Sequence, residues 1–189
     1  MSAIIGIDPG KTGAIGVLWS DGEYEVHDMP QIGDDYDAPG LADLFRSLAC
    51  REAFRIVVER QRHMRGDAAQ SSSGLFYCVG MVDMAAAMLG YPVERVDPAR
   101  WQRVMYSGES RAERAVVERV DHPAKCKCDK CKAARKEHAR RRQEGKLVGL
   151  RVARRLFPLA PLTRVKDEGR AAALLIAEYG RRMLAGGVK

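Results

Sequence analysis

The stretch AIIGIDPGKTGAIGVLWS, residues 3–20, decides the fold class. Its two apolar runs, 3–8 and 13–20, are separated by the turn signals Pro-Gly and Lys-Thr-Gly, which predicts two neighbouring β-strands. The next segment, 23–29, alternates apolar and polar residues after an Asp-Gly turn signal, as a half-buried strand does. We therefore expect the chain to begin with β structure, with a carboxylate, Asp8, at the end of the first strand.

The rest of the chain predicts helices alternating with further strands. Apolar residues recur at helical spacing in five later segments: 38–50, 75–89, 97–105, 146–157 and 165–180. Compact apolar runs at 55–60 and 91–96 predict strands. The segment 62–74 has Gly, Ser and charge without periodicity and predicts a flexible loop. This order indicates an α/β domain with a mixed sheet flanked by helices, formed by 1–189 as one unit.

Composition limits the functional classes. The chain has 189 residues, 46 % of them apolar, which suits one domain with a real core. It contains no apolar run of about 18 residues, so no membrane span is expected. The first residues lack the basic and apolar regions of a secretory signal, so none is expected. Five cysteines, three of them crowded together, form a poor disulfide framework and fit a reducing cytoplasm.

Positive charge is concentrated in one region. The net charge is +7, and residues 111–155 hold 16 Lys and Arg against 6 Asp and Glu. The remainder of the chain is therefore mildly acidic. A solvated helix held by salt bridges would explain some of this charge, but so concentrated an excess favours a surface that binds nucleic acid. We interpret residues 107–146, where the character changes, as an inserted basic lobe.

Two carboxylates stand at the ends of predicted apolar strands. Asp8 ends the first strand, and Glu59 ends the strand in IVVE. Each has a simpler explanation: Asp8 could initiate the Pro-Gly turn, and Glu59 could pair with Arg60 or Arg62. A carboxylate at the tip of a buried strand is nevertheless costly unless it is solvated, paired or bound to a metal.

A third pair of acids begins the last predicted helix. Asp167 and Glu168 would complement its dipole there, which is one explanation for them. Carboxylates from two strand ends and one helix start can also converge on hard divalent cations. Two such ions can hold the attacking and leaving oxygens of a phosphodiester. Together with the basic region, this pattern predicts a metal-dependent nuclease.

Four blocks resemble, in order and spacing, those of RuvC-type Holliday junction resolvases, particularly the phage-encoded branch. They are IIGIDPGKTGAIGV, IVVERQRHMRGDAAQSSSGLF, VERVDPARWQRVM and KDEGRAAALLIAEYG. The resemblance implies a ribonuclease H-like fold, a homodimer, and paired incisions in four-way DNA junctions with Mg²⁺ or Mn²⁺. It also implies the cytoplasm of a prokaryotic or phage-infected cell as the location.

The resemblance assigns roles to particular positions. Asp8 and Glu59 match the first two catalytic carboxylates, and residues 60–73 match the loop that approaches the junction centre. Helix 75–89 matches the helix that forms the dimer, which would explain why it is apolar nearly all round. The resemblance and the basic composition together indicate DNA-contacting side chains at Lys11, Arg60, Arg62, Arg65, Arg135, Arg140, Arg141, Arg142 and Lys166.

The last block departs from the family pattern. Family members carry two acids on the final helix, one near its start and one about a turn later. Glu168 matches the first, with Asp167 as an alternative or additional ligand, but the later position is Ala172. Asp167 could substitute for the missing acid, one metal could bind weakly, or Ala172 could be an inactivating change. A junction-binding protein without cleavage is therefore the alternative function.

A third interpretation is weaker. IDPGKTG also resembles the phosphate turn of actin-like ATPases. That fold requires a second Asp/Gly phosphate turn and a later Gly-Gly adenosine turn, and neither occurs in the right place.

The cysteine-rich segment predicts a structural zinc site. Candidate ligands lie close together in HPAKCKCDKCKAARKEH: His122, Cys126, Cys128, Cys131 and His138. A set of exposed thiols in a lysine-rich loop is the alternative, but such thiols are prone to oxidation. This segment lies outside the resemblance to the family. The helix expected after it, AARKEHARRRQ at 133–143, could lie along a DNA arm and contact its phosphates through Lys and Arg. The remaining cysteines, Cys50 and Cys78, lie in apolar helical settings and are expected in the core.

Overall fold

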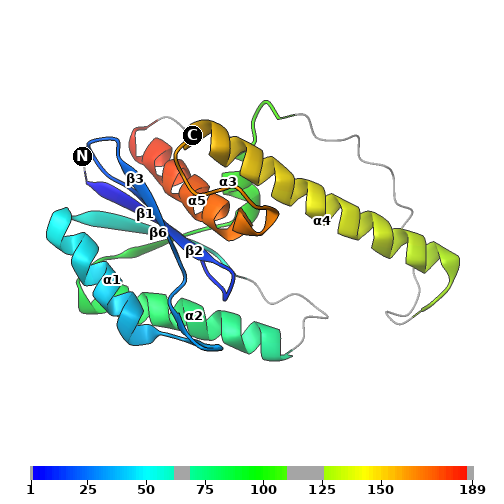
Figure 1. Ribbon diagram of the computed structural model, residues 1–189, viewed down its shortest axis with the longest axis horizontal. Helices are drawn as coiled ribbons and strands as arrows, with labels where there is room; N and C mark the ends of the chain where they lie inside the picture. Colours follow the sequence, from blue (N-terminus) through cyan, green and yellow to red (C-terminus); the bar gives the residue numbers. More distant parts are fainter. Residues whose placement is uncertain (1, 62–68, 110–125, 187–189) are drawn as a thin grey trace.

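The computed structural model describes residues 2–61, 69–109 and 126–186, and its centre is a five-stranded mixed sheet (Figure 1). Three strands are antiparallel neighbours: β1 (Ala3–Asp8), β2 (Ala14–Leu18) and β3 (Tyr24–Asp28). Two further strands run parallel to β1: β6 (Phe54–Glu59) and β7 (Val93–Val96). The resulting order, β3-β2-β1-β6-β7, confirms the predicted mixed sheet.

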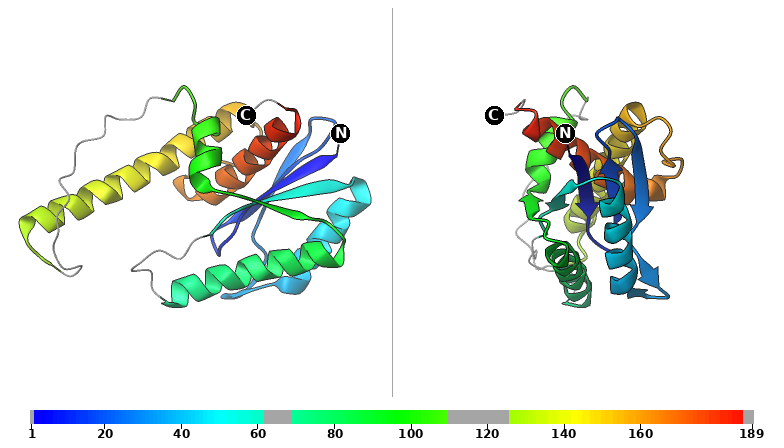
Figure 2. Two further views of the ribbon diagram at one scale, coloured as in Figure 1. Left: turned by 180° about the vertical axis from the view of Figure 1, so that it is seen from behind. Right: turned by 90° about the vertical axis from the view of Figure 1, so that its left-hand side faces the viewer.

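Helices cover both faces of this sheet (Figures 1 and 2). One face carries α1 (Ala38–Arg51) and α2 (Ala69–Met88). The other carries α3 (Pro98–Met105), α4 (Asp129–Leu156) and α5 (Glu168–Leu184), which follows the short 3₁₀ helix η1 (Val165–Asp167). A small hairpin of β4 (Gln31–Ile32) and β5 (Asp35–Tyr36), which was not predicted, precedes α1.

Alternation along the strands divides the core in two. In β1, Ala3, Ile5 and Ile7 are buried in the cluster under α1 and α2, whereas Ile4 belongs to the cluster under α5. Successive side chains of a strand point to opposite faces, so each face receives its own apolar set. The continuous apolar run in β1 is therefore explained by helices on both sides of the sheet.

Two glycines let α5 lie directly on the sheet. Gly6 of β1 and Gly16 of β2 are register partners. A Cβ atom at Gly6 would lie 2.2 Å from the backbone nitrogen of Ala177 and 2.3 Å from the carbonyl oxygen of Ala173. A Cβ atom at Gly16 would lie 2.7 Å from the backbone nitrogen of Leu174. Only hydrogen at these two positions allows the backbone of α5 to approach so closely.

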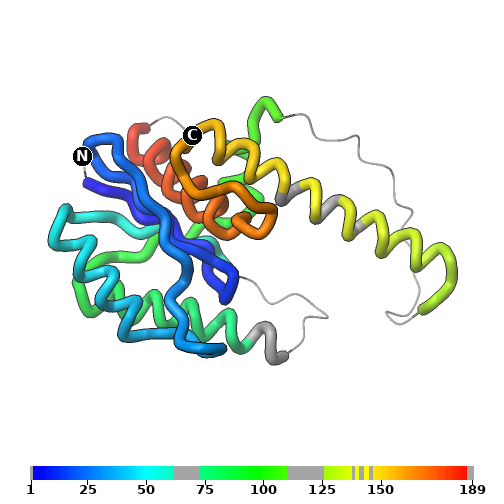
Figure 3. The backbone as a smooth tube through the Cα atoms, in the orientation of Figure 1, coloured from blue at the N-terminus to red at the C-terminus, as the bar shows by residue number. Residues whose placement is uncertain are grey.

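The structure differs from the predicted elements in two helices. α2 begins at Ala69, within the segment predicted as loop; the part of that loop at 62–68 lies outside the described residues. α4 begins at Asp129 and runs without a break to Leu156, so the helices expected at 133–143 and 146–157 form one helix, whose first half extends away from the body of the protein (Figure 3). The described part of the predicted insert after residue 126 thus leads into this helix.

The two isolated cysteines have different environments. Cys78 is fully buried, as predicted, in the cluster under α1 and α2. The prediction for Cys50 was wrong, because that residue is exposed near the end of α1. The buried positions of α1 are Leu41, Phe45 and Leu48, and Cys50 does not share their helical face.

Gly6→Ala is expected to lower the free energy of unfolding by about 2 kcal/mol or more, because α5 would have to move away from the sheet. Chemical denaturation measures the loss. Gly74→Ala is the matched control, since a Cβ atom at that helical position meets nothing within 4 Å. It should leave stability unchanged or raise it by up to about 1 kcal/mol. Equal effects of the two substitutions would refute the close approach.

Candidate active site

Asp8 and Glu59 lie at the ends of adjacent parallel strands. Ile7 of β1 is in register with Val58 of β6, so the residue after each is a carboxylate at the same edge of the sheet. Asp8 lies on the same strand face as Ile4, and Glu59 lies on the same face as Val57. Both of these apolar residues pack under α5. Strand alternation therefore places both carboxylates on the α5 face.

Glu59 is held by hydrogen bonds in a largely buried position. Its Oε2 atom accepts a hydrogen bond from Trp101 Nε1 at 2.8 Å, and Oε1 accepts a longer one from Gln61 Nε2 at 3.4 Å. Trp101 itself is fully buried in α3. Burial raises the pKa of Glu59, and the bonds from Trp101 and Gln61 offset part of that rise.

The start of α5 meets the turn that follows Asp8. A Cβ atom at Gly169 would lie 2.1 Å from the carbonyl oxygen of Thr12 and 3.2 Å from the Cα atom of Gly13. This contact brings Glu168, the first residue of α5, to the edge of the sheet where Asp8 lies. The Oε2 atom of Glu168 is buried there. Glu168 is thus the acid of the last block that the fold directs towards the strand-end carboxylates.

Asp167 is engaged in a local structural arrangement. Its side chain accepts hydrogen bonds from the backbone nitrogen of Arg164 at 2.7 Å and from Arg164 Nη2 at 2.8 Å. These bonds cap η1 just before α5 begins. The side-chain bonds from Arg164 lower the pKa of the buried Asp167 carboxyl. In this structure Asp167 stabilises the approach to α5, with its carboxylate directed to Arg164.

A second ion pair, which sequence reasoning missed, fastens α5 to the sheet. Arg170 Nε lies 2.6 Å from Asp28 Oδ1, and Nη2 lies 2.5 Å from Oδ2, a two-point contact between α5 and the end of β3. The hydrogen bonds from Arg170 lower the pKa of Asp28. Because 142 positions separate these residues, no local pattern could have indicated the pair.

The carboxylates suit hard cations but do not enclose a single ion. Asp8, Glu59 and Glu168 offer oxygen ligands, which Mg²⁺ and Mn²⁺ prefer. Within the described part of the chain, however, three ligand atoms come within 4.8 Å of one another only at the cysteines. The acids therefore form an open arrangement of hard ligands at one edge of the sheet.

Ala172 lies on α5 one turn after Glu168. The spacing of four residues puts both on the same side of the helix. Ala172 is partly buried against the cluster that includes Trp101 and Leu150. An acid at this position would extend the row of carboxylates along α5, and alanine leaves an apolar surface instead.

Several predicted DNA-contacting residues flank the acids. Lys11 is exposed in the turn after Asp8 and donates a hydrogen bond to the carbonyl oxygen of Asp34. Arg60 follows Glu59, and its Nη1 atom lies 3.9 Å from Asp97 Oδ2. Lys166 is exposed in η1. These three cations stand within three residues of a carboxylate in the sequence.

The other predicted DNA contacts fall on α4 or outside the described residues. Arg140 forms ion pairs with Glu137 and Glu144, so part of its charge is balanced within α4. Arg135 is exposed and donates to the carbonyl oxygen of Cys126. Arg141 and Arg142 belong to α4, but their side chains lie outside the description, as do residues Arg62 and Arg65 entirely.

The predicted zinc ligands are brought together in part. The ligand atoms of Cys126, Cys128 and Cys131 all lie within 4.8 Å of one another. Partial burial and the two neighbouring thiols raise the pKa of Cys131 to about 11. His122 lies outside the described residues, and His138 lies in α4 with its side chain outside the description.

Comparison with known proteins identifies the fold. The structure of T. thermophilus RuvC in complex with Holliday junction substrate matches with a TM-score of 0.56 and 19 % sequence identity, covering 99 % of this chain and 98 % of that one. The chain has a RuvC-like fold. A second Thermus thermophilus RuvC structure gives a TM-score of 0.48 at 16 % identity, covering 96 % of each chain. No protein-family model and no curated protein sequence matches this chain.

The RuvC-like architecture is the one predicted from the sequence: a ribonuclease H-like mixed sheet between helices, with a basic, cysteine-containing segment. The comparison covers nearly the whole of both chains, so the similarity is not confined to the sheet.

Asp167→Asn is expected to lower the free energy of unfolding at neutral pH by about 1 kcal/mol, a modest value because Arg164 is half exposed. The folded-state pKa of Asp167 is lowered, so its stabilisation is complete above the ordinary pKa of about 4 and disappears as pH falls through the lowered value. Thermal unfolding across acid pH should therefore show the difference between the parent chain and the variant shrinking.

Arg164→Gln is the matched partner substitution. It should cause a similar loss, and the double variant should lose no more than the single variants do together. An increase in stability from Asp167→Asn would contradict the capping role, since it would mark this carboxylate as a strained ligand.

Proposed function

We propose that the chain is a metal-dependent endonuclease that cuts four-way or branched DNA junctions by paired phosphodiester hydrolysis. The observation that carries this proposal is the meeting of Asp8, Glu59 and the start of α5 at one edge of the sheet. The similar solved structure is of a RuvC with Holliday junction substrate, which supports the choice of DNA as the substrate. Placement in the phage-encoded branch rests on the four sequence blocks.

Asp8, Glu59 and Glu168 would hold Mg²⁺ or Mn²⁺, with Asp167 as an additional ligand if it releases Arg164. When bound, the ions supply Lewis acidity at the scissile phosphate and the means to activate water. The chain's own contribution is orientation. Trp101 fixes one oxygen of Glu59, and the close contact of Gly169 with Thr12 fixes the start of α5 beside Asp8.

Glu59 is suited to cation binding by its burial. The raised pKa shows that its charged form is disfavoured when no cation is near. A bound divalent ion would reverse that preference and release the proton as it binds. Metal affinity at this edge of the sheet should therefore increase with pH.

Basic residues supply the affinity for the phosphate backbone. Lys11, Arg60 and Lys166 flank the acids, and α4 extends a highly basic half away from the body (Figure 3). A duplex arm lying along α4 would be contacted through its phosphates, which requires no particular base sequence. This arrangement supports recognition of DNA shape rather than of a base sequence.

We also propose a homodimer formed through α2. Tyr77, Met84 and Met88 expose a row of apolar side chains on that helix, beside a groove of about 510 Å³ that α1 completes. Large apolar surfaces of this kind are normally covered by another protein surface. A second copy of α2 would cover this one and place two active sites on one junction.

The proposed location is the cytoplasm of a prokaryotic or phage-infected cell, where such DNA would be met. The thiol-rich composition supports a reducing compartment. Among the described segments, every helix is too short or too polar to span a bilayer.

A synthetic four-way junction tests the activity. With Mg²⁺ or Mn²⁺ the chain is expected to make paired nicks, whereas Asp8→Asn and Glu168→Gln should lower the rate about a hundredfold or more while junction binding is retained. Denaturing gels measure cutting, and mobility shifts in Ca²⁺ measure binding. Cutting of the junction by both variants at the parent rate would refute the assigned site.

Substitutions at Ala172 distinguish an active junction nuclease from a junction-binding protein that does not cut. If the chain as written binds junctions tightly without cutting, and Ala172→Asp or Ala172→Glu restores cutting, it is a junction-binding protein rather than an active nuclease. We expect the parent chain to cut, with the acidic variants changing its rate and metal requirement. Ala172→Ser is the matched control for a polar substitution without a metal-binding charge.

Met84→Glu is expected to convert a dimer into monomers, because it places a charge in the middle of the apolar row on α2. Sedimentation velocity measures the assembly state. Leu159→Glu is the matched control, because Leu159 is even more exposed, at 89 % against 64 % for Met84, but lies in a different part of the surface. A parent chain that is monomeric at high concentration would end the dimer proposal.

A further inference from the structure

Three cysteine side chains converge at the tip of α4. Cys126, Cys128 and Cys131 are each partly buried, and their sulfur atoms lie within 4.8 Å of one another. Sulfur ligands of a tetrahedral zinc ion, at about 2.3 Å from the metal, lie about 3.8 Å apart. Adjustments of about 1 Å would therefore bring all three into ligand positions.

The backbone holds this arrangement at the start of the helix. Cys128 is the N-cap residue of α4 and Cys131 lies in its first turn, which puts the two side chains on the same end of the helix. The backbone nitrogen of Lys132 donates to the carbonyl oxygen of Cys128 at 3.0 Å, as the first helical bond. Arg135 Nη2 donates to the carbonyl oxygen of Cys126, which keeps the preceding residues folded against the helix.

Positive charge surrounds the cluster and would balance the negative charge of thiolate ligands around a bound ion. The start of a helix carries partial positive charge, which stabilises anions beside it. Lys127, Lys130 and Lys132 are exposed around the cysteines, and the acidic side chain beside them in the described part of this segment is Asp129, which pairs with Lys132. Three thiolates and one divalent ion would carry a net charge of about −1, which these lysines balance.

A disulfide does not account for the cluster. None of the five cysteines, all of which are described, forms a disulfide in the structure. Any disulfide among the three clustered residues would use two sulfurs and leave the third beside it. Soft thiolate ligands in this number and spacing instead match the preference of Zn²⁺.

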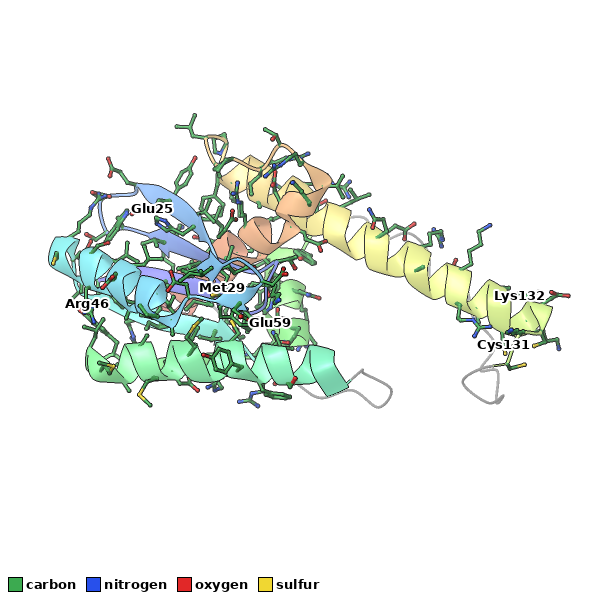
Figure 4. The ribbon with its side chains drawn as sticks, turned by 60° about the horizontal axis from the view of Figure 1, so that its bottom comes forward. Glu25, Met29, Arg46, Glu59, Cys131 and Lys132 are labelled. Carbon is green, nitrogen blue, oxygen red and sulfur yellow. The ribbon has the colours of Figure 1, made fainter. Side chains whose placement is uncertain are left out.

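We propose that Cys126, Cys128 and Cys131 bind one Zn²⁺ ion, with its fourth position filled by another donor, and that the ion fastens the first turn of α4. One ion held by Cys126 before the helix, Cys128 at the N-cap and Cys131 in the first turn would join the chain on both sides of the helix start. The site is structural and remote from the acids: Figure 4 shows Cys131 at the far end of α4, well separated from Glu59.

This site goes beyond the proposed nuclease function and does not depend on it. Zinc binding is measured without DNA, so its failure would leave the junction-cutting proposal intact. Conversely, a chain that cuts no DNA could still bind zinc at α4.

Metal analysis of the full chain tests the site. Protein purified under reducing conditions without chelator, and supplied with Zn²⁺, is expected to retain one ion per chain. Replacing Zn²⁺ by Co²⁺ should give the thiolate-to-cobalt charge-transfer band in the near ultraviolet. Cys128→Ser and Cys131→Ser should each lose most of the bound metal and the band, whereas Cys50→Ser, at an exposed cysteine outside the cluster, should keep both.

Hydrogen exchange gives a second readout, which measures the stability of the helix rather than its metal content. Removal of Zn²⁺ should speed amide exchange in the first turns of α4 and leave the second half, which packs in the core at Leu150 and Ala153, unchanged. Reduced protein that retains no Zn²⁺, or a Cys131→Ser variant that retains the parent amount and the same cobalt spectrum, would overturn the proposal.

Discussion

The close contact between α5 and the sheet is the constraint on which the rest of the structure depends. Gly6 and Gly16 are paired across β1 and β2, and α5 lies on them through Ala173 and Ala177. Ordinary side chains would hold a helix farther from a sheet, and here that distance would remove the start of α5 from the edge where Asp8 and Glu59 end their strands. The geometry of the acidic site is thus set by residues that carry no chemistry.

Ion pairs lie at both ends of α5: one fastens the helix to the sheet, one caps the turn before it, and those at its far end lie within the helix itself. Arg170 binds Asp28 on β3 near the helix start, and Arg164 binds Asp167 just before it. At the other end, buried Glu178 accepts hydrogen bonds from Arg181 and Arg182. Burial opposes the charge of Glu178, but the bonds from the two arginines prevail and lower its pKa. A buried carboxylate held in this way is a structural group, whereas the hydrogen-bond donors to Glu59 among the described residues are the uncharged Trp101 and Gln61, and its pKa is raised.

Local sequence patterns predicted the sheet and the positions of its acids. β1 ends at Asp8 and β6 at Glu59, as predicted, because apolar runs bounded by turns or charge specify short buried strands. The helix expected at 133–143 was confirmed as part of α4, but its continuity with the helix expected at 146–157 was not predicted. The first half of α4 faces solvent and has no apolar periodicity, so only the helix propensity of its Lys, Arg, Glu and Ala residues indicates helix there. Cys50 was misplaced because an apolar neighbourhood does not fix which side of a helix a residue occupies.

The acidic helix start was only partly predictable. The sequence favoured Glu168 and kept Asp167 as an alternative or additional ligand, and the structure separates the two: Asp167 is directed to Arg164, and Glu168 lies at the edge near Asp8. That distinction depends on a 3₁₀ turn and on the tertiary contact of Gly169 with Thr12, neither of which has a sequence signature. The catalytic roles of these acids remain a proposal that the fold supports.

The continuity of α4 has a mechanical consequence. It is a single helix of 28 residues, about 42 Å long, and only its second half is packed in the core, at Leu150, Ala153 and the adjoining Phe157. Its second half packs against α5, the helix that carries Glu168 (Figure 1). One continuous, stiff helix therefore connects the exposed, cysteine-bearing tip of the molecule to the element that bears one of its acids.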